Sequence, residues 1–215
     1  MPSLPFTDDF SGPEIGKDWS TNRASIVSGR LRIDAVANAY DGFAALPPFT
    51  PIRDTMWTAR LFAPGDTTGQ AWWFQVEIED PSDLLAFVIL GNTMELIEVV
   101  GGEEVSDSAG YHPDFDKWLR IRIDGTTVKF QSSADGTSWE TKGELTTSLD
   151  VDDMWGFRVG WGYHSGSPSP AYLEIDDFSA VAISGPEGGQ VMAHAGSGFV
   201  PTTRRVLTPE GWVEA

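Results

Sequence analysis

The stretch WLRIRIDGTTVKFQSSADGTSW, residues 118–139, decides the fold class of this chain. From Leu119 to Asp124 apolar and charged side chains alternate, and the alternation returns from Val128 to Ser132. The pairs Asp124-Gly125 and Asp135-Gly136 are turn signals that follow each run. One apolar face and one charged face are typical of an antiparallel sheet with one side in water. The stretch therefore predicts paired β-strands.

Glycine and proline divide the rest of the chain into short segments, and helix signals are nearly absent. The expected strands are Ala24–Val27, Arg30–Ala35, Gly42–Ala45, Trp57–Phe62, Ala71–Glu79, Leu84–Leu90, Met94–Val100, Trp118–Ile123, Thr127–Ser133, Gly156–Tyr163 and Ala171–Ile183, with a short edge strand within Phe6–Phe10. So many short strands indicate a sandwich or a barrel. We interpret Trp118 and Trp139 as core anchors and turn packing rather than ligand contacts.

The composition limits the kinds of partner. The apolar fraction of 40% is sufficient for a core, and the net charge of −18 opposes attraction to phosphate backbones and anionic membranes. The absence of cysteine excludes disulfides and thiolate metal sites. The first residues have no basic and apolar character, so we expect no signal peptide, and no apolar run has the length of a membrane span.

The character of the sequence changes near Ser184. Residues 184–189 read as a linker, and the last residues end in an apolar and aromatic group around Trp212. This tail is too short to fold alone. We expect one domain over residues 1–183 and, over 184–215, a linker and a docking segment that orders on a partner. The alternative is a strand that packs back on its own domain.

Three segments together resemble the concanavalin A-like lectin/glucanase superfamily, in particular its laminin-G-like and carbohydrate-binding bacterial members. They are FTDDFSG…W from Phe6 to Trp19, WLRIRIDG…SADGTSW, and YLEIDDFSAV from Tyr172 to Val181. The resemblance implies an all-β, two-sheet antiparallel β-sandwich (jelly roll) with about five to seven strands in each sheet. It also implies that one sheet is concave and that the first and last strands are adjacent.

The ending RRVLTPEGWVEA resembles the C-terminal endings of minor tail proteins from phages of actinobacteria. This resemblance implies a non-enzymatic virion component, a minor tail or tail-tip protein that presents a lectin-like domain to host glycans. Residues 186–215 would then bind other tail proteins, and we expect a homo-oligomer, with a trimer as the working hypothesis. The alternative is an extracellular carbohydrate-binding module or glycoside hydrolase of a bacterium.

The sequence argues against catalysis. Hydrolases of this superfamily carry E-x-D-x-x-E or E-x-D-x-E on one strand, because a retaining pair of carboxylates must share a face. The candidates Glu77–Asp80 and Glu174–Asp177 both lack the final glutamate. The three histidines lie in loop-like contexts, and there is no Gly-x-Ser-x-Gly elbow. We therefore expect that the protein is not an enzyme.

Four aspartates form a candidate metal site. Asp8 and Asp9 lie near the first strand, and Asp176 and Asp177 lie on the last. If these strands pair, the carboxylates converge, and a structural Ca²⁺ would relieve their repulsion. The alternative is that each aspartate caps a turn or faces solvent.

Alternation on Ala71–Glu79 predicts a core face through Trp72 and an outer face through Trp73. An aromatic ring beside amide and carboxylate groups suits a sugar, whose ring has an apolar face and whose hydroxyls form hydrogen bonds. The predicted ligand-binding residues are Arg60, Trp73, Gln75, Glu77 and Arg158, with Tyr163 and His164 at the rim. The alternative is a salt-bridged outer face that binds no ligand.

Overall fold

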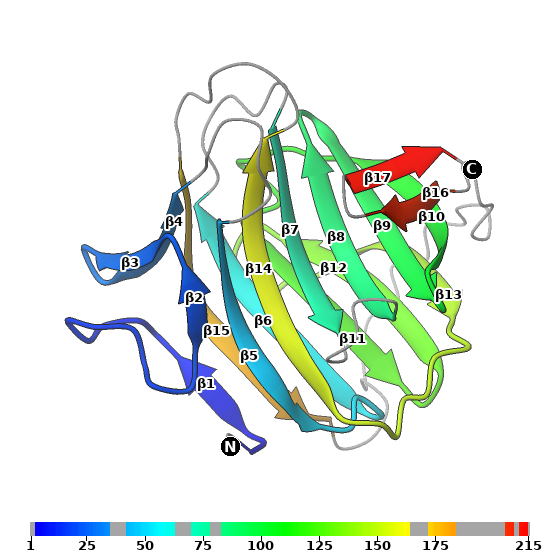
Figure 1. The fold of residues 1–215 in the computed structure, drawn as a ribbon, viewed down its shortest axis with the longest axis horizontal. Coiled ribbons are helices and arrows are strands. Elements are labelled where there is room, and N and C mark those ends of the chain that lie inside the picture. Colours follow the sequence, from blue (N-terminus) through cyan, green and yellow to red (C-terminus); the bar gives the residue numbers. More distant parts are fainter. Residues whose placement is uncertain are drawn as a thin grey trace.

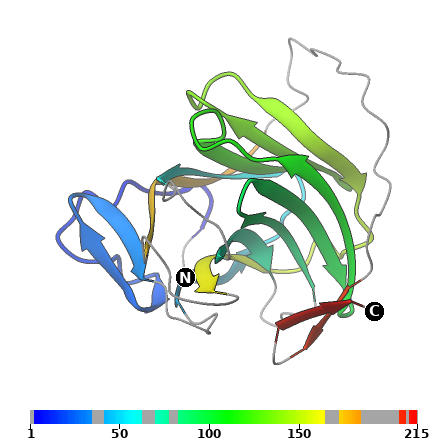
Figure 2. The ribbon, with the colours of Figure 1, turned by 90° about the horizontal axis from the view of Figure 1, so that it is seen from above.

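The computed structural model describes residues 3–34, 42–62, 70–77, 83–163, 172–183, 205–208 and 211–214. These residues form seventeen β-strands in two antiparallel sheets that pack face to face (Figures 1 and 2). No helix occurs in these ranges, so none of them provides an apolar helix that could cross a membrane. The architecture confirms the predicted concanavalin A-like β-sandwich.

One sheet has eight strands and lies at the back in Figure 1. In spatial order it contains β13 (Glu140–Thr146), β12 (Thr127–Ser133), β11 (Trp118–Asp124), β6 (Thr55–Phe62), β15 (Tyr172–Ala182), β4 (Arg30–Asp34) and β3 (Ala24–Val27), while β1 (Phe6–Asp8) pairs with β15. The pairing of β1 with β15 confirms that the first strand and the last strand of the sandwich are neighbours.

The other sheet has nine strands and faces the reader in Figure 1. In spatial order it contains β17 (Gly211–Glu214), β16 (Arg205–Thr208), β10 (Glu103–Gly110), β9 (Thr93–Val100), β8 (Leu84–Leu90), β7 (Gln70–Glu77), β14 (Trp155–Tyr163), β5 (Gly42–Thr50) and β2 (Ser20–Asn22). Figure 2 shows that this sheet curves, so that its outer face is concave.

The core lies between the sheets and is built from the predicted apolar alternation. Leu119, Ile121 and Ile123 of β11 are fully buried, as are the alternate residues Trp72 and Phe74 of β7. Aromatic residues fill the centre, where the Phe157 ring contacts the rings of Trp19, Trp57, Phe74 and Phe178. These edge, tilted and stacked contacts add stability beyond the burial of apolar area.

The turn after β12 explains the second half of the opening stretch. The Asp135 carboxylate accepts hydrogen bonds from the backbone N–H groups of Thr137 and Ser138, both at 2.8 Å, which holds its pKa well below the usual range. Gly136 has a φ of 76°, and a Cβ there would lie 2.9 Å from the Trp118 ring. Glycine therefore lets Trp118 pack directly on the turn.

The expectation that Trp118 and Trp139 are core anchors is wrong. Both side chains are only partly buried, and Trp118 begins β11 on the face opposite Leu119, which lies in the core. The alternation of β11 decides this, because residues an odd number of positions apart point to opposite faces. The turn packing of Trp118 is confirmed.

Residues 205–208 and 211–214 form a hairpin at the edge of the nine-stranded sheet. Its strand β16 meets β10 at a single register pair, Glu103 with Val206. In the structure the tail therefore packs back on its own domain, which was the alternative that the sequence left open. Its role as a docking segment for a partner stays a prediction.

Candidate functional site

The concave face places three predicted ligand-binding residues side by side. Trp73, Gln75 and Glu77 alternate on β7 with the buried core residues, so they point out of the sandwich. Arg158 of the neighbouring strand β14 is the register partner of Gln75. The structure therefore brings Trp73, Gln75, Glu77 and Arg158 together on one face.

Trp73 lies over the backbone of β14. Its register partner is Gly160, and a Cβ added to Gly160 would collide with the indole ring of Trp73. The absence of a side chain at this position lets the ring lie across the neighbouring strand. Trp73 is only partly buried, so the ring keeps an exposed surface. This geometry gives a flat aromatic platform on the sheet.

A second aromatic ring borders the platform, and the sequence did not reveal it. Phe43 of β5 is the other register partner of Gly160, so Phe43, Gly160 and Trp73 lie in one row across three strands. The Arg158 guanidinium carbon lies 5.0 Å from the Phe43 ring centroid, within the range of a cation–π contact. The sequence did contain a signal for it: Phe43 directly precedes Ala44 on the strand, so if Ala44 points into the core, Phe43 points outward.

The polar part of the site is a group of three side chains. Arg158 Nε lies 3.0 Å from Oε1 of Glu77, an ion pair in which the N–H is not aligned for a hydrogen bond. The Gln75 amide donates a hydrogen bond to Oε2 of Glu77. Burial raises the pKa of the Glu77 carboxyl, and the charge of Arg158 and the Gln75 hydrogen bond oppose that rise. The group offers both donors and acceptors to a hydroxylated ligand.

The concave face becomes apolar beyond β7. Leu84 and Ala86 of β8 and Ile97 and Val99 of β9 form a small cluster separate from the main core, and each is at most 3% exposed. Leu84 and Ala86 are the register partners of Glu77 and Gln75. The polar group therefore adjoins a buried apolar cluster on the outer side of the sheet.

Arg60 does not belong to this face, so its expected grouping with Trp73 is wrong. Arg60 lies on β6, in the eight-stranded sheet, and its register partners are Trp118 and Asp176. Alternation along β6 gave the correct outward direction, but only the strand pairing decides which sheet a strand joins. Tyr163 ends β14, where its side chain is outside the described part of the structure, and His164 lies outside the described residues.

The pairing of β1 with β15 brings three of the four predicted metal ligands to one pocket. Asp8, Asp9 and Asp177 line a pocket of about 400 Å³ together with Thr7, Phe178 and Ser179. Asp8 accepts hydrogen bonds from the Trp19 indole and from the Phe10 backbone N–H, both at 2.8 Å. Both of its oxygens therefore already stabilise the fold.

The other aspartates of this set also have local partners. Asp9 accepts a hydrogen bond from the Ser11 N–H at 3.1 Å, and Asp177 lies 3.7 Å from Arg60. Asp176 accepts a hydrogen bond from the Asp177 N–H, and burial raises its pKa. Among the described residues, no group of three or more acidic or histidine side chains is arranged to hold a metal. The Ca²⁺ site stays a prediction.

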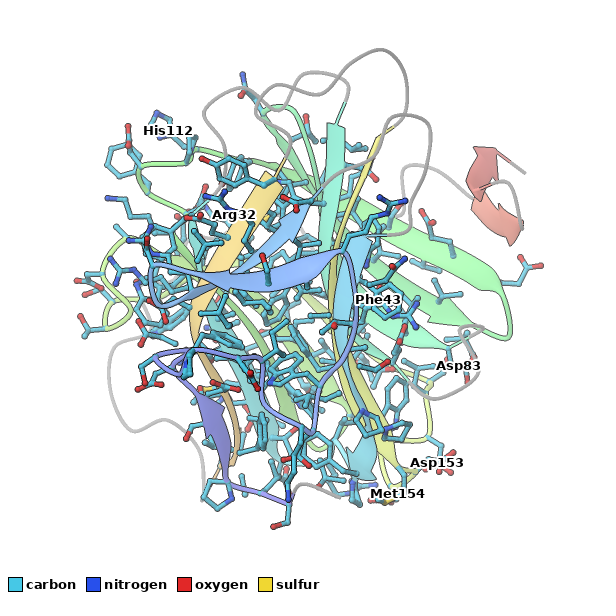
Figure 3. The ribbon with its side chains drawn as sticks, turned by 60° about the vertical axis from the view of Figure 1, so that its left-hand side comes forward. Arg32, Phe43, Asp83, His112, Asp153 and Met154 are labelled. Carbon is cyan, nitrogen blue, oxygen red and sulfur yellow. The ribbon has the colours of Figure 1, made fainter. Side chains whose placement is uncertain are left out.

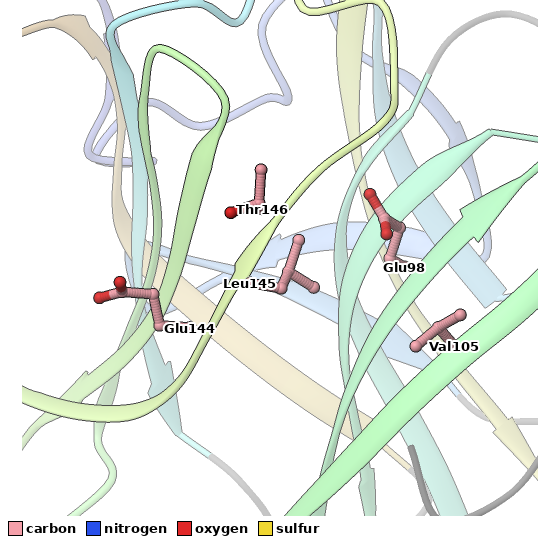
Figure 4. Close-up of a pocket in the computed structure, with 5 residues that line it drawn as sticks. All are labelled: Glu98, Val105, Glu144, Leu145 and Thr146. Carbon is pink, nitrogen blue, oxygen red and sulfur yellow. The ribbon is translucent and has the colours of Figure 1, made fainter. Parts of the chain in front are cut away.

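A second pocket, of about 350 Å³, opens at the edge of the sandwich, between β9 and β10 of one sheet and β13 of the other (Figure 4). Glu98 is its buried charged residue and accepts a hydrogen bond from the Thr147 hydroxyl. Burial raises the pKa of Glu98, and the hydrogen bonds from Thr147 and Ser148 oppose that rise. With one buried carboxylate already hydrogen-bonded, this pocket has fewer ligand-directed groups than the concave face.

No known protein family matches the sequence, and no curated protein is similar to it in sequence. The fold, however, is shared with many solved structures. A laminarinase from Rhodothermus marinus has a TM-score of 0.62 at 10% identity, over 85% of this chain and 100% of the laminarinase. The CBM2 module of the evolved Dit of Lactobacillus casei BL23 phage J-1 has a TM-score of 0.59 at 9% identity, over 81% of this chain and 93% of the module.

The GH43 protein BlXynB from Bacillus licheniformis has a TM-score of 0.60 at 15% identity, over 82% of this chain. The chain spans 39% of the length of that enzyme. At such low identities these likenesses concern the fold alone. They confirm the concanavalin A-like fold that the three sequence segments implied.

Proposed function

We propose that the protein binds a glycan through its concave face. The observation that supports this most directly is the Trp73 ring lying over Gly160, with Phe43 beside it in the same row. Aromatic rings of this kind pack against the C–H face of a sugar, while Arg158, Glu77 and Gln75 supply hydrogen bonds to hydroxyls. The glycan-active proteins that share the fold favour the same ligand class.

We propose further that binding is not coupled to catalysis. A retaining glycosidase needs two carboxyl groups about 5 Å apart on the site. In the described part of β7 the only carboxylate on the concave face is Glu77, which is paired with Arg158, and the next outward position toward the start of the strand is Gln75. This arrangement suits ligand binding better than acid–nucleophile chemistry.

The cellular role that we propose is that of a phage virion component, a minor tail or tail-tip protein. Two observations support it: the ending RRVLTPEGWVEA resembles minor tail proteins of actinobacteriophages, and a phage Dit module shares the fold. In this role residues 186–215 would bind other tail proteins, the protein would form a homo-oligomer, and the concave face would contact the host cell surface.

The test of the glycan site is the variant Trp73→Ala, assayed on a glycan array and by adsorption to host cells. We expect at least about a tenfold loss of binding, because a central aromatic contact is worth more than about 1.4 kcal/mol. Phe115→Ala is the matched control, since Phe115 is 64% exposed in the loop between β10 and β11. Undiminished binding by Trp73→Ala would contradict the site, and no binding by the wild type would contradict the function.

A glycoside hydrolase is the second candidate. The buried Glu77 carboxyl, whose pKa is raised, has the property of a general acid, and a laminarinase shares the fold. A reducing-sugar assay on β-glucans distinguishes the two functions. Activity that disappears in Glu77→Gln would identify an enzyme, whereas no sugar release by the wild type supports a binding protein.

A further inference from the structure

The outer face of the eight-stranded sheet, on the other side of the sandwich from the concave face, presents arginines and aromatic rings in alternation. The arginine–aromatic band consists of Arg30, Arg32, Arg60, Phe62, Trp118 and Tyr172. These residues lie on the adjacent strands β4, β15, β6 and β11. The alternate residues of the same strands, including Leu31 and Leu61, are buried, so the band points outward. Figure 3 shows Arg32 beside β15, away from Phe43 on the other sheet.

Each guanidinium of the band lies over an aromatic ring. The Arg32 guanidinium carbon is 3.9 Å from the Tyr172 ring centroid. The Arg30 carbon is 3.5 Å from the Phe62 centroid, and the Arg60 carbon is 4.6 Å from the same centroid. Arg60 is also 5.8 Å from the Trp118 ring. All four distances lie within the cation–π range of about 6 Å.

The band continues into the stretch that decides the fold. Arg120 is the next outward residue of β11 after Trp118, and its guanidinium carbon lies 4.0 Å from the Trp139 ring. Trp118 packs on the turn at Gly136. The two tryptophans at the ends of this stretch are therefore partly buried on the outer side of the sheet and do not lie in the core.

Arginine is concentrated on this face. The chain has ten arginines, and Arg30, Arg32, Arg60, Arg120 and Arg122 all lie on the outer side of the eight-stranded sheet. Half of the arginines therefore lie on one sheet face of a protein whose net charge is −18; of these five, Arg120 and Arg122 are buried, and Arg30, Arg32 and Arg60 are the accessible ones. Arginine and aromatic residues are the types most enriched in binding hot spots.

The arginines of the band retain hydrogen-bonding capacity. Arg30 and Arg32 share one carboxylate, that of Glu174, at 3.3 Å and 2.6 Å. Arg60 has an ion pair with Asp177 at 3.7 Å and donates no hydrogen bond to another described residue. The side chains of Arg30 and Arg60 are 37% and 40% exposed. A guanidinium has five N–H donors, so both can still bind an incoming anion.

We propose that the arginine–aromatic band is a second binding surface, for a linear glycan that carries carboxylate groups on some of its sugars. The rings present flat apolar surfaces to sugar rings, and the guanidinium groups between them donate charge-assisted hydrogen bonds to the anionic groups. The four strands place these groups along about 14 Å, at a strand spacing of about 4.8 Å. A narrow row of side chains suits an extended polymer. A stable protein–protein interface instead uses a broad surface of about 800 Å² on each partner.

Charge separates this ligand from nucleic acid, which also binds to aromatic and arginine side chains. Nucleic acid has a charge on every phosphodiester, so a protein of net charge −18 repels it strongly. A glycan with more widely spaced charges meets less repulsion and still satisfies the guanidinium groups. The observations therefore favour the glycan.

The experiment is affinity electrophoresis of the full chain in gels that contain hyaluronate, which carries one carboxylate on every second sugar, or dextran, or single-stranded DNA. We expect hyaluronate to retard the wild type, with weaker retardation at high salt, and dextran to retard it less. The variant Arg60→Gln should weaken this binding about tenfold, the usual value of one charge-assisted hydrogen bond. Arg60→Lys should also bind more weakly, because it keeps the charge but loses the stacking plane.

Two control variants make the result specific. Arg53→Gln removes an equally exposed arginine that pairs with Asp152 outside the band, and it should bind like the wild type. Trp73→Ala alters only the concave face and should also bind the anionic polymer normally, so failure of the concave site is distinguishable from failure of the band. Equal binding by Arg60→Gln and the wild type, no retardation by hyaluronate, or tighter binding of single-stranded DNA would each overturn the proposal.

Discussion

Gly160 is the residue on which the geometry of the concave site depends, although it has no side chain to contact a ligand. The Trp73 indole occupies the space that a Cβ at position 160 would need. Gly160→Ala must therefore displace the ring or strain the sheet, and we expect a loss of about 1–3 kcal/mol in the free energy of unfolding. Glycan binding should fall as it does in Trp73→Ala, which can be measured on the same glycan array alongside urea denaturation.

Gly110 provides the matched control for this substitution. It ends β10, and a Cβ there would meet nothing within 4 Å. Gly110→Ala should leave stability unchanged or raise it by up to about 1 kcal/mol, because alanine restricts the unfolded chain more than glycine does. If Gly160→Ala behaves like Gly110→Ala, Trp73 does not lie on β14 in solution.

At the scale of one strand, β9 places Glu98 in the pocket at the edge of the sandwich, where burial raises its pKa above the ordinary value of 4.5. The folded state therefore binds a proton that the unfolded state has released, so this group favours folding at low pH. Its contribution is lost as the pH rises from 4.5 through the folded pKa. We expect Glu98→Gln to reduce the fall in unfolding free energy between pH 4.5 and pH 7, measured by urea denaturation at several pH values.

Glu95 of the same strand is the control for Glu98. It is only partly buried and lies on the opposite face of the sheet. Glu95→Gln removes the same charge and controls for the change in net charge. A pH slope in Glu98→Gln equal to that of Glu95→Gln would mean that Glu98 does not titrate abnormally in the folded protein.

The pairing of β1 with β15 gives the predicted Ca²⁺ site its own test. Asp8, Asp9 and Asp177 line one pocket there, and bound Ca²⁺ would stabilise the folded state by about 2.7 kcal/mol at a hundred times its dissociation constant. Thermal melting should show a higher melting temperature in Ca²⁺ than in EGTA. Asp9→Asn should abolish the difference because it removes one of the proposed ligands, and the hydrogen bond that Asp9 accepts among the described residues is the local one from Ser11. Equal melting of the wild type in Ca²⁺ and EGTA removes the hypothesis.

The strands also show how much of the fold can be predicted from the sequence. Strands with a clear apolar alternation, such as β7 and β11, were predicted with the correct inward faces. Strand β10 and the edge strand β13 were missed because Glu103–Gly110 and Glu140–Thr146 are mostly polar, and their pairing with neighbours is what makes them strands. Each sheet consequently has more strands than the resemblance implied.

For the molecule as a whole, the concave site also shows what the sequence pattern can and cannot predict. Alternation within β7 correctly grouped Trp73, Gln75 and Glu77, because residues two apart share a face. It could not decide which strands are neighbours, so Arg60 was assigned to the wrong sheet and Phe43 was not found. Strand order depends on the packing of the entire core, which a local pattern does not contain.

The proposed virion role makes a prediction about the whole chain, the truncation of residues 186–215. The core cluster lies within residues 10–180, and the hairpin of β16 and β17 meets the sandwich at one register pair. We expect the truncated chain to lose less than about 2 kcal/mol of unfolding free energy. Virions formed in cells that produce only the truncated chain should nevertheless not contain it, as measured by mass spectrometry of purified virions.

The two measurements separate the two roles considered for the tail. A folded truncated chain that is missing from particles supports docking through residues 186–215. If the truncated chain is still incorporated, these residues are not the docking segment. If the truncated chain fails to fold, the tail stabilises the sandwich through more than the pairing of Val206 with Glu103, and it is a structural element of the domain.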